Sequence, residues 1–450
     1  MNIVVMMLDS LRPDHLGCGG HPEVRTPHID QVAAEGILFE RAYAEYPITV
    51  PSRTALVSGC YTWTNRPWRA LLPTDMHLAE VLHEHGYATA AFSDAPFNPG
   101  GNFDRGFEVF EYFDVGKCHG HDEDIEVDIP DAYFPPDAVE QERQYYVNTL
   151  KGRALAMQRY GKTCPELLFD RAVQWLEAND RRPFLLWVDS FEPHEPWAPV
   201  SPYYEMYGGD RHRRYIPMPV GPDIQWAGEG DLDHVLRLYM GDITHTDEMV
   251  GRVTAKLDEL GLAEDTLVVI LSDHGEPFGE HGTIRKYYVP VYEELARMVW
   301  IMRKPGAVPE GAVARALVQN TDLAPTILDL LGIEPPPRKV EGAFQGIVGG
   351  DEMDGVSLVP LLTGDEPAVR DCVFNGAFGL RASIRTDRYK LIDNQGEKPN
   401  ELFDLDQDPD EKRNLIEGSP DLAGELHRRL WEFRRKWGTA LAWRDRPAQS

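Results

Sequence analysis

The chain has 450 residues, 74 of them acidic and 45 basic, with a formal net charge of −29 at pH 7 and a pI of about 4.9. This length is too great for one small core and favours a large α/β domain with a smaller appendage. The negative charge argues against nucleic acid and anionic lipid as partners, so an anionic substrate requires a locally positive site.

The N-terminal run 1–8 is apolar and lacks the basic residues and the small-residue cleavage site of a signal peptide. No stretch reaches the roughly eighteen uninterrupted apolar residues of a membrane span. Five widely spaced cysteines, an odd number, favour reduced thiols over a disulfide framework. We therefore expect a cytoplasmic protein with no membrane partner. A homo-oligomer is possible, and the sequence leaves it open.

Short apolar runs alternate along the chain with segments of helical periodicity. Buried strands are predicted over 3–8, 88–92, 184–188, 266–271 and 298–302, and helices over 76–85, 167–179 and 236–260. Strands separated by helices predict an α/β fold with a doubly wound, mostly parallel sheet flanked by helices.

Irregular segments separate these elements and divide the chain. The stretches 115–136 and 208–233 are rich in turn-forming and acidic residues, so they predict surface loops beside the site that select the substrate. A proline-rich break begins at 335–337. We expect a large domain over 1–360 and a smaller C-terminal α+β domain over 361–450, with short antiparallel strands and a terminal helix near 420–437.

Acidic side chains follow two of the predicted strands directly. Asp9 comes after the run 3–8, and Asp273-His274 comes after 266–271. Ligands of doubly wound sheets collect at the carboxyl ends of strands, so these distant groups are expected to converge there. Taken alone, each has another interpretation: Asp9 as a helix N-cap, and Asp273-His274 as a capped strand-to-helix turn.

The order of several motifs along the chain favours a functional site over these local interpretations. Asp9 is followed by Thr49-Val50-Pro51-Ser52-Arg53, by Pro193-His194-Glu195-Pro196, by Ser272-Asp273-His274-Gly275 and by Lys286. Together with further matching stretches such as 26–30, 104–107 and 321–326, this order resembles the sulfatase family of the alkaline phosphatase superfamily. The resemblance covers nearly the whole chain, and it implies the same α/β fold.

The first residue of the Thr49 motif departs from the family pattern. Sulfatases carry there a Cys or Ser that is converted to formylglycine, and threonine cannot form that aldehyde. If Thr49 is a nucleophile, it must attack as an alkoxide generated beside a metal ion. A formylglycine hydrate expels sulfate by collapsing to the aldehyde, whereas a threonine sulfate has no such exit. Thr49 therefore favours phosphorus over sulfur.

The resemblance also implies a metal site. Asp9, the Thr49 hydroxyl, Asp273 and His274 are expected to hold one divalent metal ion, with Arg53 steadying the nucleophile and the developing negative charge. Many sulfatases have a second Asp where this chain has Ser10 and an Asn where it has His274. The imidazole and the smaller number of carboxylates shift the expected ion from Ca towards Mn or Zn, with its identity left open among the three.

Two further residues are expected to contact the substrate. By resemblance, His194 touches the transferred group or protonates the leaving oxygen, the alternative being a loop histidine bonded to backbone. Lys286 is expected to clamp a non-bridging oxygen, although its neighbour Arg285 competes for that role and the two are alternatively a solvated pair.

The Gly-Lys-x-His element of sulfatases is missing after the strand 88–92. Asp94 and Pro96 occupy this region and cannot replace its cations, but Asn98 can donate a hydrogen bond to a phosphoryl oxygen. Two other features are set aside. The stretch 119–124 has metal-like composition without ligand spacing and is interpreted as a solvated turn, and Cys60 is interpreted as a buried thiol.

These observations predict a metal-dependent hydrolase with Thr49 as the nucleophile, acting on a small anionic phosphate monoester, phosphate diester or phosphonate ester. One alternative is a sulfuric ester hydrolase that works without formylglycine. The other is a binding protein of the same fold that has lost turnover.

Overall fold

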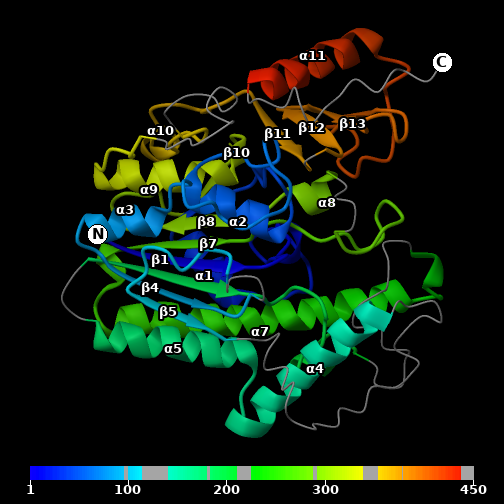
Figure 1. The fold of residues 1–450 in the computed structure, drawn as a ribbon. Coiled ribbons are helices and arrows are strands. Elements are labelled where there is room, and N and C mark those ends of the chain that lie inside the picture. Colours follow the sequence, from blue (N-terminus) through cyan, green and yellow to red (C-terminus); the bar gives the residue numbers. More distant parts are fainter. Residues whose placement is uncertain are drawn as a thin grey trace.

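The computed structural model describes residues 1–95, 100–113, 140–179, 183–209, 224–286, 291–337, 353–377 and 379–436. Within these ranges an eight-stranded sheet forms the centre of the molecule, in the order β5-β4-β6-β1-β7-β8-β2-β9 (Figure 1). Its strands are β5 (Val109–Tyr112), β4 (Ala88–Ser93), β6 (Phe184–Ser190), β1 (Asn2–Leu8), β7 (Thr266–Leu271), β8 (Trp300–Arg303), β2 (Ile37–Phe39) and β9 (Ala312–Ala314).

The pairing confirms the predicted mostly parallel sheet. The central strand β1 runs parallel to both β6 and β7, and β8 is antiparallel to its neighbours β7 and β2. Every residue of β1, β6 and β7 is buried. These strands carry apolar side chains on both faces of the sheet, and both faces are covered. All five predicted strands are present, although the last begins at Trp300 rather than 298.

Helices cover the two faces of this sheet (Figure 1). On one face, α1 (Pro27–Ala34), α5 (Cys164–Ala178) and α7 (Asp231–Glu259) pack over Val4, Met6 and Leu8. On the other face, α2 (Thr49–Ser58), α3 (Leu78–Glu84), α9 (Leu323–Leu331) and α10 (Val359–Thr363) pack over Ile3, Val5 and Met7. The alternation along β1 thus supplies two separate cores.

The predicted helices are present, with corrected limits. The segment expected to be a loop up to residue 233 already becomes helical at Asp231, where Gly230 adopts a left-handed conformation and the Asp231 carboxylate accepts a hydrogen bond from Gly228 N. Several helices were not predicted, among them α2 and α4 (Glu140–Tyr160). Each residue of α2 is buried, polar Thr49, Ser52 and Arg53 included, so the sequence does not separate a polar from an apolar face to reveal the helical period. The predicted loop 115–136 lies outside the described residues.

A smaller antiparallel sheet follows, as predicted for the C-terminal part. Its strands β11 (Cys372–Gly376), β12 (Ala382–Thr386), β13 (Tyr389–Asp393) and β14 (Glu401–Asp404) are joined in that order, and α11 (Pro420–Lys436) lies over them (Figure 1). The boundary at residue 360 stays a prediction. None of the described helices is both long and apolar enough to cross a membrane.

The two parts of the molecule are linked by a buried ammonium group. Lys390 of β13 is fully buried, with Nζ 2.9 Å from Glu293 Oε1 and 3.0 Å from Glu411 Oε1. Burial alone would raise the pKa of Glu293, but the Lys390 charge lowers it to about 2. Glu293 belongs to α8 (Glu293–Ala296), which lies beside the central sheet, so this ion pair fixes the smaller sheet against the rest.

Replacing Lys390 with methionine is therefore expected to reduce the free energy of unfolding by about 3–5 kcal/mol, because it leaves two buried carboxylates without their cation. Chemical denaturation followed by circular dichroism measures this change. The matched control is Lys398→Met, whose side chain is 39 % exposed and pairs with Glu401, and which is expected to cost less than about 1 kcal/mol. Equal losses in the two variants would contradict the prediction.

Candidate active site

Three carboxylates meet where the central strands end. Asp9 follows β1, Asp273 follows β7 after one residue, and Asp189 lies near the end of β6. The parallel register aligns Leu8 with Ser190 and Met7 with Leu271, so the chain leaves all three strands at one edge. Asp9 N then donates to Ser190 O at 3.0 Å. The sheet topology therefore brings together residues that lie up to 264 positions apart.

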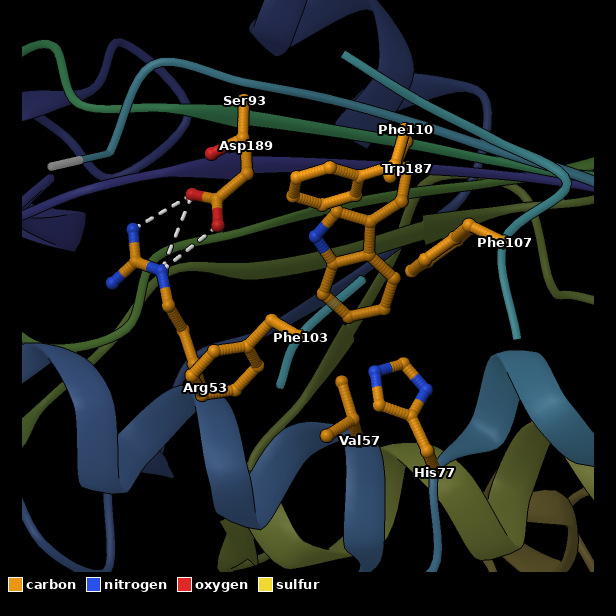
Figure 2. A pocket seen from close by; sticks show the side chains of 10 residues that line it. Arg53, Val57, His77, Ser93, Phe103, Phe107, Phe110, Trp187 and Asp189 are labelled. Carbon is orange, nitrogen blue, oxygen red and sulfur yellow. Dashed lines mark hydrogen bonds and ion pairs between the residues drawn. The ribbon is translucent and has the colours of Figure 1, made fainter. Parts of the chain in front are cut away.

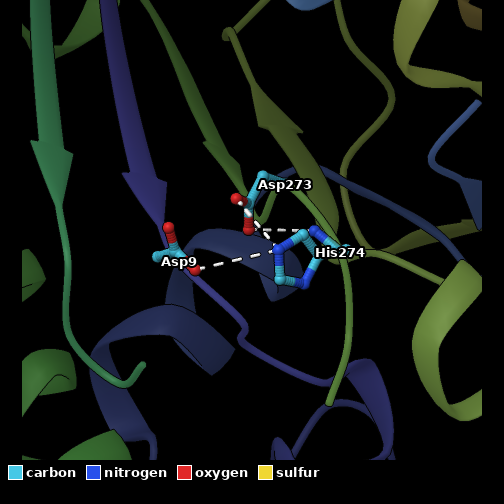
Figure 3. A group of neighbouring side chains, drawn as sticks. All are labelled: Asp9, Asp273 and His274. Carbon is cyan, nitrogen blue, oxygen red and sulfur yellow. Dashed lines mark hydrogen bonds and ion pairs between the residues drawn. The ribbon is translucent and has the colours of Figure 1, made fainter. Parts of the chain in front are cut away.

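Asp9, Asp273 and His274 form the candidate metal cluster of the described residues. All three are fully buried, and each offers a ligand atom within 4.8 Å of the other two. His274 Nε2 lies 3.3 Å from Asp273 Oδ2 and 4.0 Å from Asp9 Oδ1 (Figure 3). Asp9 contacts no helix N-terminus as a cap, and its carboxylate instead accepts from Ser10 Oγ at 2.9 Å.

The tautomer of His274 suits a cation. Its Nδ1 lies 2.7 Å from Gly275 O, which can only accept, so Nδ1 carries the proton. Burial, and after it the charge of Lys286, lower the pKa of His274 to about 3, so the ring is neutral. The lone pair of Nε2 therefore faces two carboxylates, an arrangement that is unfavourable until a positive charge lies between them.

The carboxylates point to the same conclusion. Burial raises the pKa of Asp9, and the nearby charge of Asp273 raises it further. Two buried carboxylates beside an unprotonated imidazole nitrogen fit a divalent ion, which would stabilise both negative charges at once. A donor set of two oxygens and one nitrogen suits Mn²⁺ or Zn²⁺ better than Ca²⁺, which typically binds oxygen ligands alone.

Thr49 lies at the edge of this cluster, as the first residue of α2. Its Oγ1 is 3.4 Å from His274 Nε2, and the residue is 5 % exposed. The helix begins after Ile48; Pro51 has no N–H and Ser52 N donates to Ile48 O, so the first turn presents the N–H groups of Thr49 and Val50 at this end. This end of the helix dipole favours negative charge on a group at Thr49.

Arg53 lies one helical turn after Thr49 and is almost completely buried. Its guanidinium donates to Asp273 Oδ2, lies 3.0 Å from Asp9 Oδ2, and donates to Asp189 Oδ1 at 2.7 Å through Nη2. Figure 2 shows the pair of Arg53 and Asp189 beside an apolar pocket. The aromatic side chains that line this pocket are Phe103, Phe107, Phe110 and Trp187.

Asp189 was not predicted as a site residue. It follows the apolar run 184–188 as Asp9 follows 3–8, so the strand-end signal that identified Asp9 was also present here. Its carboxylate accepts from Arg53 Nε at 3.0 Å as well as from Nη2, an almost bidentate arrangement. Asp189 thereby fixes the direction of the Arg53 side chain.

Lys286 points at the cluster, and Arg285 does not. Lys286 Nζ lies 3.2 Å from Ser10 Oγ and 3.4 Å from one oxygen each of Glu195 and Glu276. Arg285 Nε donates instead to Glu195 Oε1 at 2.9 Å. Both cations are nearly buried, with side chains 12 % and 9 % exposed, so the alternative of a solvated pair is wrong.

Ser10 connects Lys286 to the two acidic residues. Its hydroxyl accepts from the ammonium, which can only donate, and donates to Asp9 Oδ1. Its backbone N–H donates to Asp273 Oδ1 at 3.0 Å. Ser10 makes these contacts with a φ of 62°, a left-handed conformation that is uncommon for serine. Sequence patterns did not predict this bridging position.

His194 lies in the loop after β6, stacked on Phe191 with ring centroids 4.0 Å apart. Its Nδ1 is 2.6 Å from Glu195 O and 3.1 Å from Glu195 Oε2, so this nitrogen carries the proton and Nε2 can accept one. Burial lowers the pKa of His194 to about 4, against the opposing effect of Glu195. Glu195 Oε2 also lies 3.4 Å from Lys286 Nζ, so Glu195 connects His194 to the ammonium group that reaches the cluster.

The remaining residues that the sequence analysis singled out lie outside the cluster or outside the described residues. Asn98 and the stretch 119–124 lie outside the described residues. Asp94, in the region where sulfatases carry a lysine, is buried and accepts a hydrogen bond from Phe191 N, so it holds the backbone of the His194 loop. Cys60 is confirmed as a buried thiol, and its Sγ lies 3.4 Å from Ser58 O.

Comparison with known proteins gives consistent matches over the chain. The family described as Sulfatase matches residues 1–333, and the one described as N-sulphoglucosamine sulphohydrolase, C-terminal matches residues 279–436. An ulvan-active sulfatase of Formosa agariphila is 28 % identical over 95 % of this chain and 80 % of its own length. The multifunctional alkaline phosphatase superfamily protein PehA of Trinickia caryophylli is 25 % identical over 98 % of this chain and 95 % of its own length.

A solved structure supports the fold. The phosphonate monoester hydrolase of Agrobacterium radiobacter superimposes with a TM-score of 0.73, covering 96 % of this chain and 95 % of that protein at 22 % identity. Members of the sulfatase family generally bind a divalent metal ion, for which Asp9, Asp273 and His274 are the candidate ligands here. The chain belongs to the sulfatase family of the alkaline phosphatase superfamily, and it is a hydrolase that acts on ester bonds.

Proposed function

We propose that this protein is a metal-dependent hydrolase in which the Thr49 hydroxyl attacks phosphorus in a small anionic phosphate ester or phosphonate ester. The observation that carries this proposal is the position of Thr49 Oγ1, 3.4 Å from His274 Nε2, which is itself 3.3 Å from Asp273 Oδ2. A hydroxyl at a helix N-terminus, next to a group of metal-ligand side chains, has the surroundings of an activated nucleophile.

The ligand cluster and Thr49 act together in this proposal. A divalent cation held by Asp9, Asp273 and His274 would supply positive charge that lowers the pKa of a neighbouring hydroxyl. In the first step a bond forms between Thr49 Oγ1 and phosphorus while the bond from phosphorus to the leaving oxygen breaks. The products are a phosphorylated Thr49 and an alcohol. In the second step a water oxygen attacks phosphorus, and the bond to Thr49 breaks.

His194 moves the protons in both steps. With Nδ1 held by Glu195, a protonated His194 gives the proton on Nε2 to the leaving oxygen, while Thr49 attacks as an alkoxide whose proton has passed to solvent. His194 then takes a proton from the attacking water and returns it to Thr49. The Glu195 carboxylate, 3.1 Å from Nδ1, stabilises the imidazolium that forms between these transfers.

Lys286 and Arg53 hold the negative charge of the transferred group. The Lys286 ammonium has three N–H groups and reaches Ser10 Oγ beside the cluster, so it can turn one N–H to a non-bridging oxygen. Arg53 brings a guanidinium to within 3.0 Å of Asp9 Oδ2 and is held there by Asp189. Charge placed in advance where it develops during the reaction lowers the barrier.

Thr49 is the reason for preferring phosphorus. A threonine cannot expel sulfate by forming an aldehyde, so a sulfated Thr49 would have to be hydrolysed at sulfur. The Agrobacterium relative in fold is a phosphonate monoester hydrolase, which supports phosphorus. The Formosa relative is a sulfatase, which supports a sulfuric ester hydrolase without formylglycine as the second candidate.

One preparation with added Mn²⁺ tests the choice between the two. We measure kcat/KM for p-nitrophenyl derivatives of a phosphate diester, a phosphate monoester, a phosphonate ester and a sulfate. The best phosphorus ester is expected to exceed the sulfate by at least about tenfold, a difference of about 1.4 kcal/mol in transition-state stabilisation. A preference for the sulfate would overturn the proposal in favour of the second candidate.

A further inference from the structure

The loop that carries His194 and Glu195 has no regular secondary structure. It comprises residues 191–197, the first part of the segment 191–202 between β6 and the short helix α6 (Tyr203–Met206). His194 and Glu195 lie in its middle, so their positions depend on whatever fixes its two ends. Those ends are held from a different layer of the molecule, by a helix that has no part in the cluster of Asp9, Asp273 and His274.

Arg153 of α4 bridges the two ends of this loop. Its Nη2 lies 2.6 Å from Glu192 Oε1, and its Nη1 donates to Pro196 O at 2.8 Å. One rigid guanidinium thus grips the residue two positions before His194 and the residue two positions after it. The side chains of Arg153 and Glu192 are only 16 % and 10 % exposed, so water competes weakly for these contacts.

Asp242 of α7 lies beside this contact. It lines one cavity together with Arg153, Glu192 and Ala198. Glu192 Oε2 and Asp242 Oδ2 are buried, and within the described residues neither oxygen has a hydrogen-bond partner. Burial raises the pKa of both carboxyl groups, and the nearby Glu192 raises that of Asp242 further. Arg153 is therefore the cation that holds Glu192 next to a second buried acid.

We propose that Arg153 is a positioning residue for His194, and that it acts by clamping Glu192 and Pro196 so that His194 Nε2 stays within reach of the reacting oxygens. This inference rests on the proposed function of His194. Misplacement of a proton-transferring group by about 1 Å can cost on the order of 100-fold in rate. Arginine is required because lysine cannot make two divergent contacts from one planar group.

A double-mutant cycle of Arg153→Met and His194→Ala tests the proposal. We measure kcat and KM for two phosphonate monoesters: a p-nitrophenyl ester, whose leaving oxygen needs no proton, and a benzyl ester, whose leaving oxygen does. Arg153→Met is expected to lower kcat/KM, which reports the step in which the leaving oxygen departs, by about 100-fold for the benzyl ester and by less than about threefold for the p-nitrophenyl ester. KM, the melting temperature and the bound metal are expected to change little.

Coupling between the two residues decides the result. If Arg153 acts through His194, the double variant loses no more activity than His194→Ala alone. The proposal would be overturned if the activity losses of the two single variants multiplied in the double variant. It would also be overturned if Arg153→Met reduced turnover of the two esters equally. Arg153→Lys carries the same test if the methionine variant does not fold, and an intermediate loss is expected because lysine keeps one contact. The matched control is Arg171→Met, a half-exposed arginine of α5 paired with Glu111.

The same measurements separate this inference from the proposed function. If His194→Ala turns over both esters as fast as the unmodified protein, the proposed role of His194 fails, and the inference fails with it. If His194→Ala shows the dependence on the leaving group but Arg153→Met does not, only the role of Arg153 fails.

Discussion

Replacing Thr49 with alanine is expected to lower kcat for phosphate and phosphonate esters by about 10⁴-fold or more, as loss of a nucleophile does in other hydrolases. The side chain is small and nearly buried, and its Oγ1 makes a single described polar contact, to His274 Nε2. Its removal therefore deletes the attacking atom with little effect on packing. Steady-state kinetics, with the metal content measured in parallel, check this result.

Two variants control for the role of the hydroxyl. Thr49→Ser keeps the hydroxyl and is expected to remain within about tenfold of the unmodified protein. Thr54→Ala removes a buried hydroxyl from the same helix, where Oγ1 donates only to Val50 O at 3.0 Å. We expect this change to lower the free energy of unfolding by about 1 kcal/mol and to leave kcat unchanged. Turnover by Thr49→Ala within tenfold of the original rate would exclude Thr49 as nucleophile.

Replacing Asp273 with asparagine is expected to abolish stable metal binding and to lower kcat on the order of 10³-fold. Asp273 is fully buried between His274 Nε2 and Arg53, and amide oxygen is a far weaker ligand than carboxylate. Mutating a residue that only hydrogen-bonds to a metal ligand typically lowers metal affinity by about 10–100-fold. We therefore expect mutation of a ligand itself to lower it by more than about 100-fold. Elemental analysis of the purified protein gives the metal content directly.

The control lies at the opposite end of the same strand. Asp265 precedes β7 as Asp273 follows it, and its side chain is 72 % exposed. Asp265→Asn is therefore expected to keep both metal and activity. A variant at Asp273 that retains the metal would remove this residue from the ligand set. If the unmodified protein binds metal but turns over no ester, the alternative of a binding protein that has lost turnover is favoured.

The sequence predicted the sheet well because its strands are buried on both faces. The runs 184–188 and 267–271 contain only apolar residues, and such runs are typical of parallel strands covered by helices on both faces. The same argument explains why α2 was missed. Its ten residues are all buried, including polar Thr49, Ser52 and Arg53, so its sequence does not divide into an exposed polar face and a buried apolar face.

Within the site, the residues predicted from strand ends and motif order are the ones the fold brings together. Asp9, Asp273, His274 and Thr49 lie in one cluster, and Lys286 rather than Arg285 faces it. Asp189 was overlooked because a strand-end carboxylate alone is a weak signal. The contacts of Lys286 and of His194 were also missed, because Glu195 occupies the variable position of the motif 193–196 and neither Ser10 nor Glu276 was assigned a role in the site.

The sequence by itself determined the family, the order of the strands along the chain and the chemical groups available to the site, because these follow from local composition and motif spacing. The tertiary structure alone decided which groups touch. His274 has an unprotonated Nε2 because Gly275 O binds the other nitrogen, and Arg53 has its direction because Asp189 holds it. Arg153 reaches the His194 loop from a separate helix. Such contacts join residues far apart in the chain, where burial and hydrogen-bond geometry, which no local pattern encodes, select the partner.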